Sequence, residues 1–344
     1  MSFSAIKRLF TKFISESIYA NTSYLLSSWI LLSGFGFIFW TICTKIYSAE
    51  QVGIATALLA ALNLITSLSL MGFELSIIRV LPDHPDKSTL LNVCFSTASL
   101  FGIVFSFIFV LLVPFFGGNL GVVNSSVLNQ VLFFLFVVIA LGDYLTTNTF
   151  VAYRKSGYVL RKNLIFSIFK LVFPFLFISL GSYGVFSAWM ISLGLALIYG
   201  MIVLTRQFRH NFKPQLGIAP LRGMIKYSFG NYFSSFAEGF PIMVLPILIV
   251  NVYSPEEGAY YYIAMMIATF LFTISASATQ SLFAEASSSD VRMVDLVRKV
   301  LKFLVLLLIP AIVAIMLLGP YILSIFGPEY SREAADLLRI LALS

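Results

Sequence analysis

Two charged side chains lie inside neighbouring stretches of sequence that are otherwise apolar. Asp143 stands nine residues before the end of the stretch 128–152, and Lys170 stands ten residues after the start of the stretch 160–181. In two consecutive antiparallel helices, this spacing places both groups about 13–15 Å from the same end. We therefore predict an ion pair between Asp143 and Lys170, which either fixes the two helices together or responds to a proton or a phosphate.

A third isolated charge, Glu238, lies in "FSSFAEGFP", thirteen residues into the apolar stretch 225–251. Gly239 and Pro241 follow it directly, and residues of these types bend helices and free backbone carbonyl groups. A carboxylate beside free carbonyls is typical of a cation or proton site. The alternative is a neutral glutamic acid that is hydrogen-bonded to another helix.

Other charged residues stand at the ends of apolar stretches. Glu74 and Arg79 flank one end of the stretch 52–77 and suit a role as interfacial anchors. Alternatively, Arg79 acts with Arg154 and Arg161 to bind an anionic diphosphate, because the planar guanidinium group matches phosphate oxygens in pairs.

The sequence contains no arrangement that is typical of an enzyme. The two histidines, His84 and His210, are far apart, and there is no nucleophile–base pair, glycine-rich phosphate loop or metal-ligand cluster. Cys43 and Cys94 fall inside apolar stretches and are expected to be small buried residues. No cofactor is expected. A membrane-embedded glycan ligase, polymerase or glycosyltransferase is disfavoured, because the connections on the outer side are short and lack catalytic carboxylates.

The composition requires a lipid environment. Of 344 residues, 59% are hydrophobic and 11% are charged, whereas soluble domains carry about 25% charged residues. The mean hydropathy is +0.96. Apolar stretches long enough to span a bilayer recur along the chain, which predicts an all-α polytopic membrane protein with helices at 24–46, 52–77, 90–114, 128–152, 160–181, 183–204, 225–251, 257–282 and 293–318, and a tenth that begins near 332.

The positive charges are distributed unevenly among the connections between these stretches. Eighteen of the 22 Lys and Arg residues precede the first predicted helix or follow the second, fourth, sixth and eighth. This is the pattern of the positive-inside rule. It predicts a cytoplasmic N-terminus in the cell (inner or plasma) membrane, so the net charge of +7 reflects topology and indicates no nucleic-acid partner. The segment 1–20 is predicted to form a short amphipathic helix on the inner leaflet, and the alternative is a frayed basic tail.

The chain repeats itself at a spacing of about 207 residues. "YSAEQVGIA" (47–55) matches "YSPEEGAYY" (253–261), "YLLSS" (24–28) matches "NYFSS" (231–235), and "PFFGGNL" (114–120) matches "SIFGPEY" (324–330). Six helices separate the copies, so the repeats are parallel. The predicted domains are an N-terminal lobe (1–204, helices 1–6), a cytoplasmic linker (205–224), and a partial C-terminal lobe (225–344).

The second repeat is predicted to be incomplete. A full copy would end near residue 411, about 65 residues beyond Ser344. Thirteen residues from Arg332 onward make a helix of about 20 Å, whereas a bilayer core needs about 30 Å. We therefore expect a C-terminally truncated chain, and a non-functional fragment is one reading of it.

With these repeats, the chain resembles the polysaccharide exporters, or Wzx-type oligosaccharide flippases, of the multidrug/oligosaccharidyl-lipid/polysaccharide (MOP) superfamily. The resemblance depends on "TKIYSAEQVGIATALLAALNLITSLSLMGFELSIIRVLP" (44–82), "YSPEEGAYYYIAMMIA" (253–268) and "ILSIFGPEYSREAADLLRILAL" (322–343). It implies two V-shaped lobes of six helices each, like those of the multidrug and toxic compound extrusion (MATE) transporters. Their cavity would be lined mainly by helices 1, 2, 7 and 8.

The resemblance also implies a function. It predicts alternating-access flipping of an isoprenoid-diphosphate-linked oligosaccharide from the cytoplasmic to the outer leaflet, for synthesis of cell-surface polysaccharide. The implied partners are this lipid-linked oligosaccharide, the bilayer and other polysaccharide-assembly proteins. The alternative is a MATE-type cation-coupled drug or metabolite antiporter, for which acidic residues such as Asp143 and Glu238 would be expected. The tryptophans, Trp29, Trp40 and Trp189, are expected to be anchors near the membrane interfaces.

Overall fold

The computed structural model describes residues 17–115, 118–217, 221–286 and 293–343, and this part of the chain is helical, without strands. Short 3₁₀ turns (Leu81–Asp83, Val113–Phe115, Gly118–Asn124 and Ile178–Leu180) connect some of the helices. The α-helices are α2 (Ser17–Ile46), α3 (Ala49–Leu70), α4 (Phe73–Val80), α5 (Lys87–Leu112), α6 (Val127–Ala152), α7 (Gly157–Leu176), α8 (Gly181–Gln207), α9 (Arg222–Val252), α10 (Pro255–Ala286), α11 (Met293–Ser324), α12 (Pro328–Glu333) and α13 (Ala335–Leu343).

Each predicted membrane stretch is largely helical. Seven of the described helices are long and apolar enough to cross a membrane, and the remaining predicted stretches, 160–181 and 257–282, fall mainly on α7 and α10. The chain is therefore an all-α, multi-pass membrane protein. The expected amphipathic start and part of the expected linker (218–220) lie outside the described residues.

Two predicted helices are interrupted. The stretch 52–77 breaks after α3, because Met71 and Gly72 both adopt positive φ values, 49° and 80°. Glycine reaches this region without steric cost, and the break turns the chain into the short helix α4. The predicted tenth helix is divided between α12 and α13.

The repeated "YS-x-E" motif starts a helix in both halves of the chain. At α3, the Ser48 hydroxyl accepts a hydrogen bond from the Gln51 backbone N–H (3.3 Å), and the Gln51 side chain accepts one from the Ser48 N–H. At α10, the Ser254 hydroxyl accepts a bond from the Glu257 N–H (3.2 Å). The sequence repeat is thus a repeated helix N-cap.

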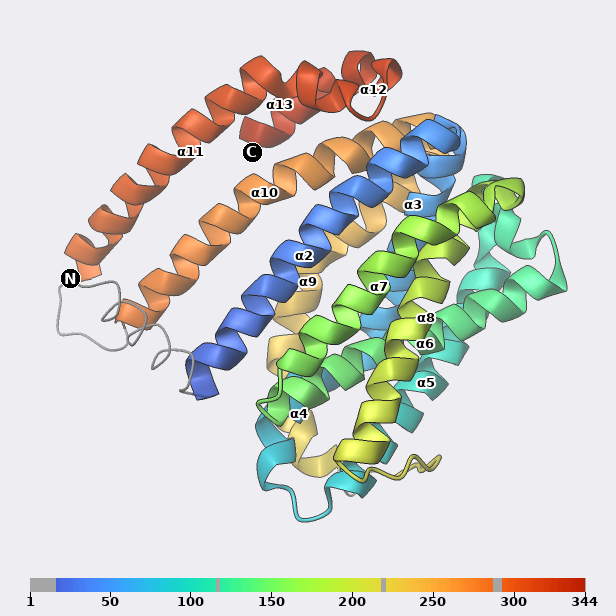
Figure 1. The fold of residues 1–344 in the computed structure, drawn as a ribbon, viewed down its shortest axis with the longest axis vertical. Helices are drawn as coiled ribbons and strands as arrows, with labels where there is room; N and C mark the ends of the chain where they lie inside the picture. Colours follow the sequence, from blue (N-terminus) through green and yellow to red (C-terminus); the bar gives the residue numbers. More distant parts are fainter. Residues whose placement is uncertain (1–16, 116–117, 218–220, 287–292, 344) are drawn as a thin grey trace, which may run out of the picture.

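The two repeats meet along α3. In Figure 1, α10, α11 and α13 lie together on one side of the molecule, while α5, α6, α7 and α8 lie on the other. The helix α3 packs against both α9 and α10. At the start of α10 the backbones nearly touch, since a Cβ added to Gly53 would lie 1.7 Å from the Pro255 carbonyl oxygen. Only glycine permits this approach.

The basic connections gather at one end of the bundle. Near the start of α2, Asn21 accepts a hydrogen bond from the Ser156 N–H (2.9 Å) in the α6–α7 turn. The segment after α8 runs along the start of α5, where the Asn92 side chain donates to the Asn211 carbonyl (3.0 Å) and the Ser96 hydroxyl accepts from the Gln215 N–H (2.9 Å). The described part of the segment after α8 is therefore attached to the first repeat.

Candidate functional site

A cavity of about 680 Å³ lies between the two repeats. Seven of the described helices line it: α2, α3, α6, α7, α8, α9 and α10. The expected helices 1, 2, 7 and 8 correspond to α2, α3, α9 and α10, so all four contribute. These four helices supply most of the lining residues, as expected, and α6, α7 and α8 supply the rest.

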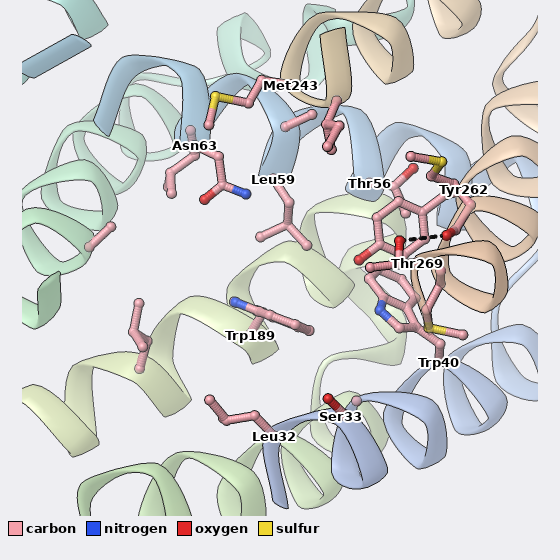
Figure 2. Close-up of a pocket in the computed structure, with 18 of the residues that line it drawn as sticks. Leu32, Ser33, Trp40, Thr56, Leu59, Asn63, Trp189, Met243, Tyr262 and Thr269 are labelled. Carbon is pink, nitrogen blue, oxygen red and sulfur yellow. Dashed lines mark hydrogen bonds between the residues drawn. The ribbon is translucent and has the colours of Figure 1, made fainter. Parts of the chain in front are cut away.

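Aromatic side chains form much of the cavity wall. All three tryptophans of the sequence line it. The Trp40 ring lies 4.7 Å from that of Tyr262 and 6.0 Å from that of Trp189, measured between centroids. Figure 2 shows Trp40 against Tyr262, with Trp189 projecting into the space between Leu59 and Leu32. The prediction of interfacial anchors is wrong for Trp40, which is buried in this cluster.

Hydroxyl and amide groups supply the polar part of the wall. They belong to five of the lining helices and offer both donors and acceptors, as hydroxyl and carboxamide groups do. Figure 2 labels four of them. They include Ser33, Thr56, Asn63, Thr147, Asn163 and Thr269.

Asp143 is the one acidic residue among the described residues that line the cavity, and it is already paired. The Lys162 ammonium donates to the Asp143 carboxylate (2.6 Å), to the Asp143 carbonyl (3.1 Å) and to the Thr147 hydroxyl. The side chain of Lys162 is fully buried, whereas that of Asp143 is 15% exposed. The ammonium is therefore held behind the carboxylate, which faces the cavity.

The predicted Asp143–Lys170 pair is wrong for a geometric reason. The helices α6 and α7 join through a short turn, and Lys162 is five residues into α7, about 7.5 Å along its axis, whereas Asp143 is about 13 Å from the end of α6. The long lysine side chain spans the difference and reaches inward. Counting residues to Cα positions ignored this reach, and Lys162 was counted only among the basic residues that follow the fourth predicted helix.

Lys170 instead lies among aromatic rings. Its ammonium is 4.7 Å from the ring centroid of Phe166 and 4.9 Å from that of Trp189. Both distances fit cation–π contacts. Its side chain is 1% exposed.

Glu238 does not have the predicted surroundings. It is exposed, and it makes no hydrogen bond or ion pair with any residue that the structure describes. The prediction of a buried glutamic acid bonded across the bundle is therefore wrong. The helix α9 continues through Gly239 and Pro241 to Val252.

The remaining candidates lie outside the cavity wall. Glu74 is partly buried in α4, and its Oε2 atom has no hydrogen-bond partner among the described residues. Burial raises the pKa of its carboxyl group. Arg79, Arg154 and Arg161 are exposed, and the Arg161 guanidinium lies 5.5 Å from the centroid of the Tyr158 ring.

This arrangement offers several kinds of contact to a bound solute. Within the described parts of the chain, no group of three or more metal-ligating side chains is present. The cavity combines aromatic surface with hydroxyl and amide groups, so it fits an amphipathic solute. Lys162 and Asn163 were missed as site residues, although their place at the start of a predicted helix beside an intramembrane acid was a usable signal.

Comparisons with known proteins give a family and a fold. The sequence model of the family described as "Polysaccharide biosynthesis protein" matches residues 18–283. No curated protein sequence is significantly similar to the chain.

Three solved structures illustrate the structural likeness. An inward-facing MATE-family multidrug resistance transporter of the MOP superfamily is 14% identical with a TM-score of 0.55, and the match covers 94% of this chain and 78% of that one. A MATE transporter in a bent conformation gives 12% identity, a TM-score of 0.45 and coverages of 96% and 79%. A MOP-superfamily transporter from Pyrococcus furiosus gives 14% identity, a TM-score of 0.42 and coverages of 95% and 77%. The first of these establishes a shared fold.

Proposed function

Because the chain belongs to the family of polysaccharide biosynthesis proteins, we propose that this membrane transporter flips an isoprenoid-diphosphate-linked oligosaccharide from the cytoplasmic to the outer leaflet. The observation that carries the proposal is the cavity between the repeats. Its aromatic surface suits an isoprenoid chain and the faces of sugar rings, and its hydroxyl and amide groups suit sugar hydroxyls.

The proposal includes an orientation and a division of the chain. The N-terminus lies in the cytoplasm, and residues 1–204 and 225–344 form two lobes that move against each other, joined by the linker 205–224. The shared location of the basic connections supports this orientation, because positive charges favour the cytoplasmic side. Arg79, Arg154 and Arg161 then belong to that side, where the diphosphate first enters.

A MATE-type antiporter is the second candidate, since a MATE transporter shares the fold. The paired state of Asp143 argues against it. The Asp143 Oδ1 atom already accepts a hydrogen bond from the Lys162 ammonium at 2.6 Å, so the charge that would attract a second cation is neutralised. Glu238 on α9 is the acid that such an antiporter could still use, because it is exposed and unpaired among the described residues.

Reconstitution in liposomes tests the proposal. A fluorescent glycan on a short isoprenoid diphosphate is placed in both leaflets, and a membrane-impermeant reductant bleaches the outer population. The protein is expected to raise the bleached fraction from about half toward the whole, whereas protein-free liposomes stay near half. No acceleration, together with protein-dependent uptake of ethidium, would instead favour the antiporter.

A further inference from the structure

The 3₁₀ segment Gly118–Asn124 lies between α5 and α6 of the first repeat and reaches the second repeat. The Asn119 side chain donates a hydrogen bond of 2.7 Å to the main-chain carbonyl of Val250 in α9. This carbonyl is among the last four of α9, which have no partner in the regular hydrogen-bond pattern of their own helix. Val250 is fully buried. Asn119 thus caps a buried helix end that belongs to the other repeat.

The rest of this segment is fixed to the first repeat. The side chains of Leu120 and Val123 are fully buried. The Asn124 side chain donates a hydrogen bond to the Val110 carbonyl of α5 (3.1 Å). A segment that is held in this way moves only with the first repeat. The hydrogen bond from Asn119 therefore ties the first repeat to α9.

Close backbone contacts between the repeats surround this hydrogen bond. A Cβ added to Gly53 of α3 would lie 1.7 Å from the Pro255 carbonyl oxygen and 3.1 Å from the Ala259 backbone nitrogen. A Cβ added to Gly258 of α10 would lie 3.8 Å from the Gly53 Cα atom. Ala259 is fully buried. We call Gly53, Val250, Pro255, Gly258 and Ala259 the seam.

The seam lies beyond one end of the cavity. On α3 and α10 the lining residues begin only after the seam, at Thr56 and Tyr261, and on α9 they end before it, at Pro246. In Figure 1 the start of α10 lies at the top of the molecule, whereas α4 and the end of α8, which precede basic connections, lie at the bottom. The seam therefore closes the cavity at the end that faces the outer leaflet in the proposed orientation.

We propose that Asn119 is a latch that holds the two repeats together at the seam, and that the cavity opens toward the outer side when its hydrogen bond to Val250 breaks. The inference rests on the proposed function, because a lipid-linked glycan that reaches the outer leaflet has to leave the cavity at this end. A neutral hydrogen bond suits this role. It is directional, and its net contribution is small enough that water can replace it in each transport cycle.

Thiol labelling of the purified full chain measures how often the seam opens. Ala259→Cys places a thiol in the seam, and Cys43→Ala removes one of the two native cysteines. The other native cysteine, Cys94 of α5, is also buried and serves as an internal reference. When the seam closes faster than the thiol reacts, the rate of labelling by a water-soluble maleimide is proportional to the open fraction. The chain with these two changes is the parent.

The test variants are Asn119→Ala and Asn119→Asp, neither of which keeps the amide donor. The matched control is Asn124→Ala, because Asn124 belongs to the same segment and its hydrogen bond to Val110 stays within the first repeat. Each Asn119 variant should label the seam thiol about fivefold faster than the parent, which corresponds to ~1 kcal/mol, a typical net value for one neutral hydrogen bond. The control should label the seam thiol at the rate of the parent, and labelling of Cys94 should not change.

A seam thiol that reacts in both Asn119 variants at the rate of the parent would overturn the inference. An equal rise in Asn124→Ala, or an equal rise at Cys94, would also overturn it, because either shows a general loosening of the fold. So would a seam thiol that stays unlabelled in every variant, since the seam would then never open. If Asn119→Ala does not fold, Asn119→Asp, which has nearly the same shape, still decides the question. The assay contains no glycan, so failure of the latch and failure of the proposed flipping are distinguishable.

Discussion

The pair between Asp143 and Lys162 leads to an asymmetric prediction. Lys162 is fully buried, whereas the Asp143 side chain is 15% exposed toward the cavity. Asp143→Asn leaves the buried ammonium without a counter-charge, because its remaining acceptors are all neutral: the new amide oxygen, the main-chain carbonyl of residue 143 and the Thr147 hydroxyl. Lys162→Met strands a carboxylate that can take up a proton or meet water from the cavity. Asp143→Asn should therefore be the more destabilising change.

The expected magnitudes follow from the distance and the burial. At 2.6 Å, and with an effective dielectric constant of about 20, the gross attraction is about 6 kcal/mol. Desolvation of both groups consumes much of this, and removal of one partner of a buried pair costs about 3–5 kcal/mol. We expect a loss in this range for Asp143→Asn, and about 1–3 kcal/mol for Lys162→Met. The double variant should recover most of the loss, because it leaves no buried charge.

The assay is unfolding of the purified protein in one detergent, followed by fluorescence, for the wild type, the single variants and the double variant. Lys155→Met is the control, since it removes a positive charge from the exposed α6–α7 turn and should cost less than about 0.5 kcal/mol. Strictly additive effects of the single changes in the double variant would refute the reasoning. So would Asp143→Asn with a stability equal to that of the control.

Three further changes probe the fold. Gly53→Val should prevent the α3–α10 contact, because its Cβ would lie 1.7 Å from the Pro255 carbonyl oxygen. The measurement is the yield of monodisperse protein, which should fall, and the control is Gly34→Val, at a position with open space. Asp86→Ala should speed amide exchange at residues 87–90, while Asp86→Asn should not, since the carboxylate accepts a hydrogen bond from the Thr89 N–H (2.9 Å). The hydrogen bonds from Thr89 lower the pKa of Asp86. The stabilisation of the start of α5 by this carboxylate is therefore present above the ordinary aspartate pKa and is lost as the pH falls through the lowered value. Burial lowers the pKa of His210, so protonation of its ring opposes the folded state. Amide hydrogen exchange at residues 209–215 should therefore rise below about pH 6.5 in the wild type, but not in His210→Phe.

Much of the fold could be predicted because lipid requires long apolar helices, and their lengths are visible in the sequence. The repeat was also visible in the sequence. The hydrogen bonds of Ser48 and Ser254 show that the repeated motif forms a helix N-cap. The break at Met71 and Gly72 was harder to predict, since an apolar stretch that turns at one glycine has the same composition as a continuous helix. Backbone dihedral angles decide the break, and hydropathy does not report them.

The site was predicted less well because the exact partners depend on side-chain reach. The sequence placed Asp143 and Lys170 at similar Cα depths, whereas the actual partner, Lys162, lies nearer the start of α7 and reaches Asp143 through its long side chain. Glu238 was predicted to lie inside the bundle because its neighbours in the sequence are apolar, whereas the structure places it at an exposed position. The tryptophans were assigned to interfaces on a general tendency, whereas Trp40 and Trp189 pack with Phe39 and Tyr262 inside the protein.

The two lysines of α7 differ in their surroundings. Lys162 satisfies the acid that a cation-coupled transporter would need free, and it does so from a fully buried position. Lys170, two turns farther along, has aromatic neighbours and no anionic partner among the described residues. A cationic drug that enters this cavity would meet an acid that Lys162 already neutralises, and the described lining holds no other acidic residue to attract it. An amphipathic solute without a positive charge needs no free carboxylate in the cavity, and the proposed glycan on an isoprenoid diphosphate is such a solute.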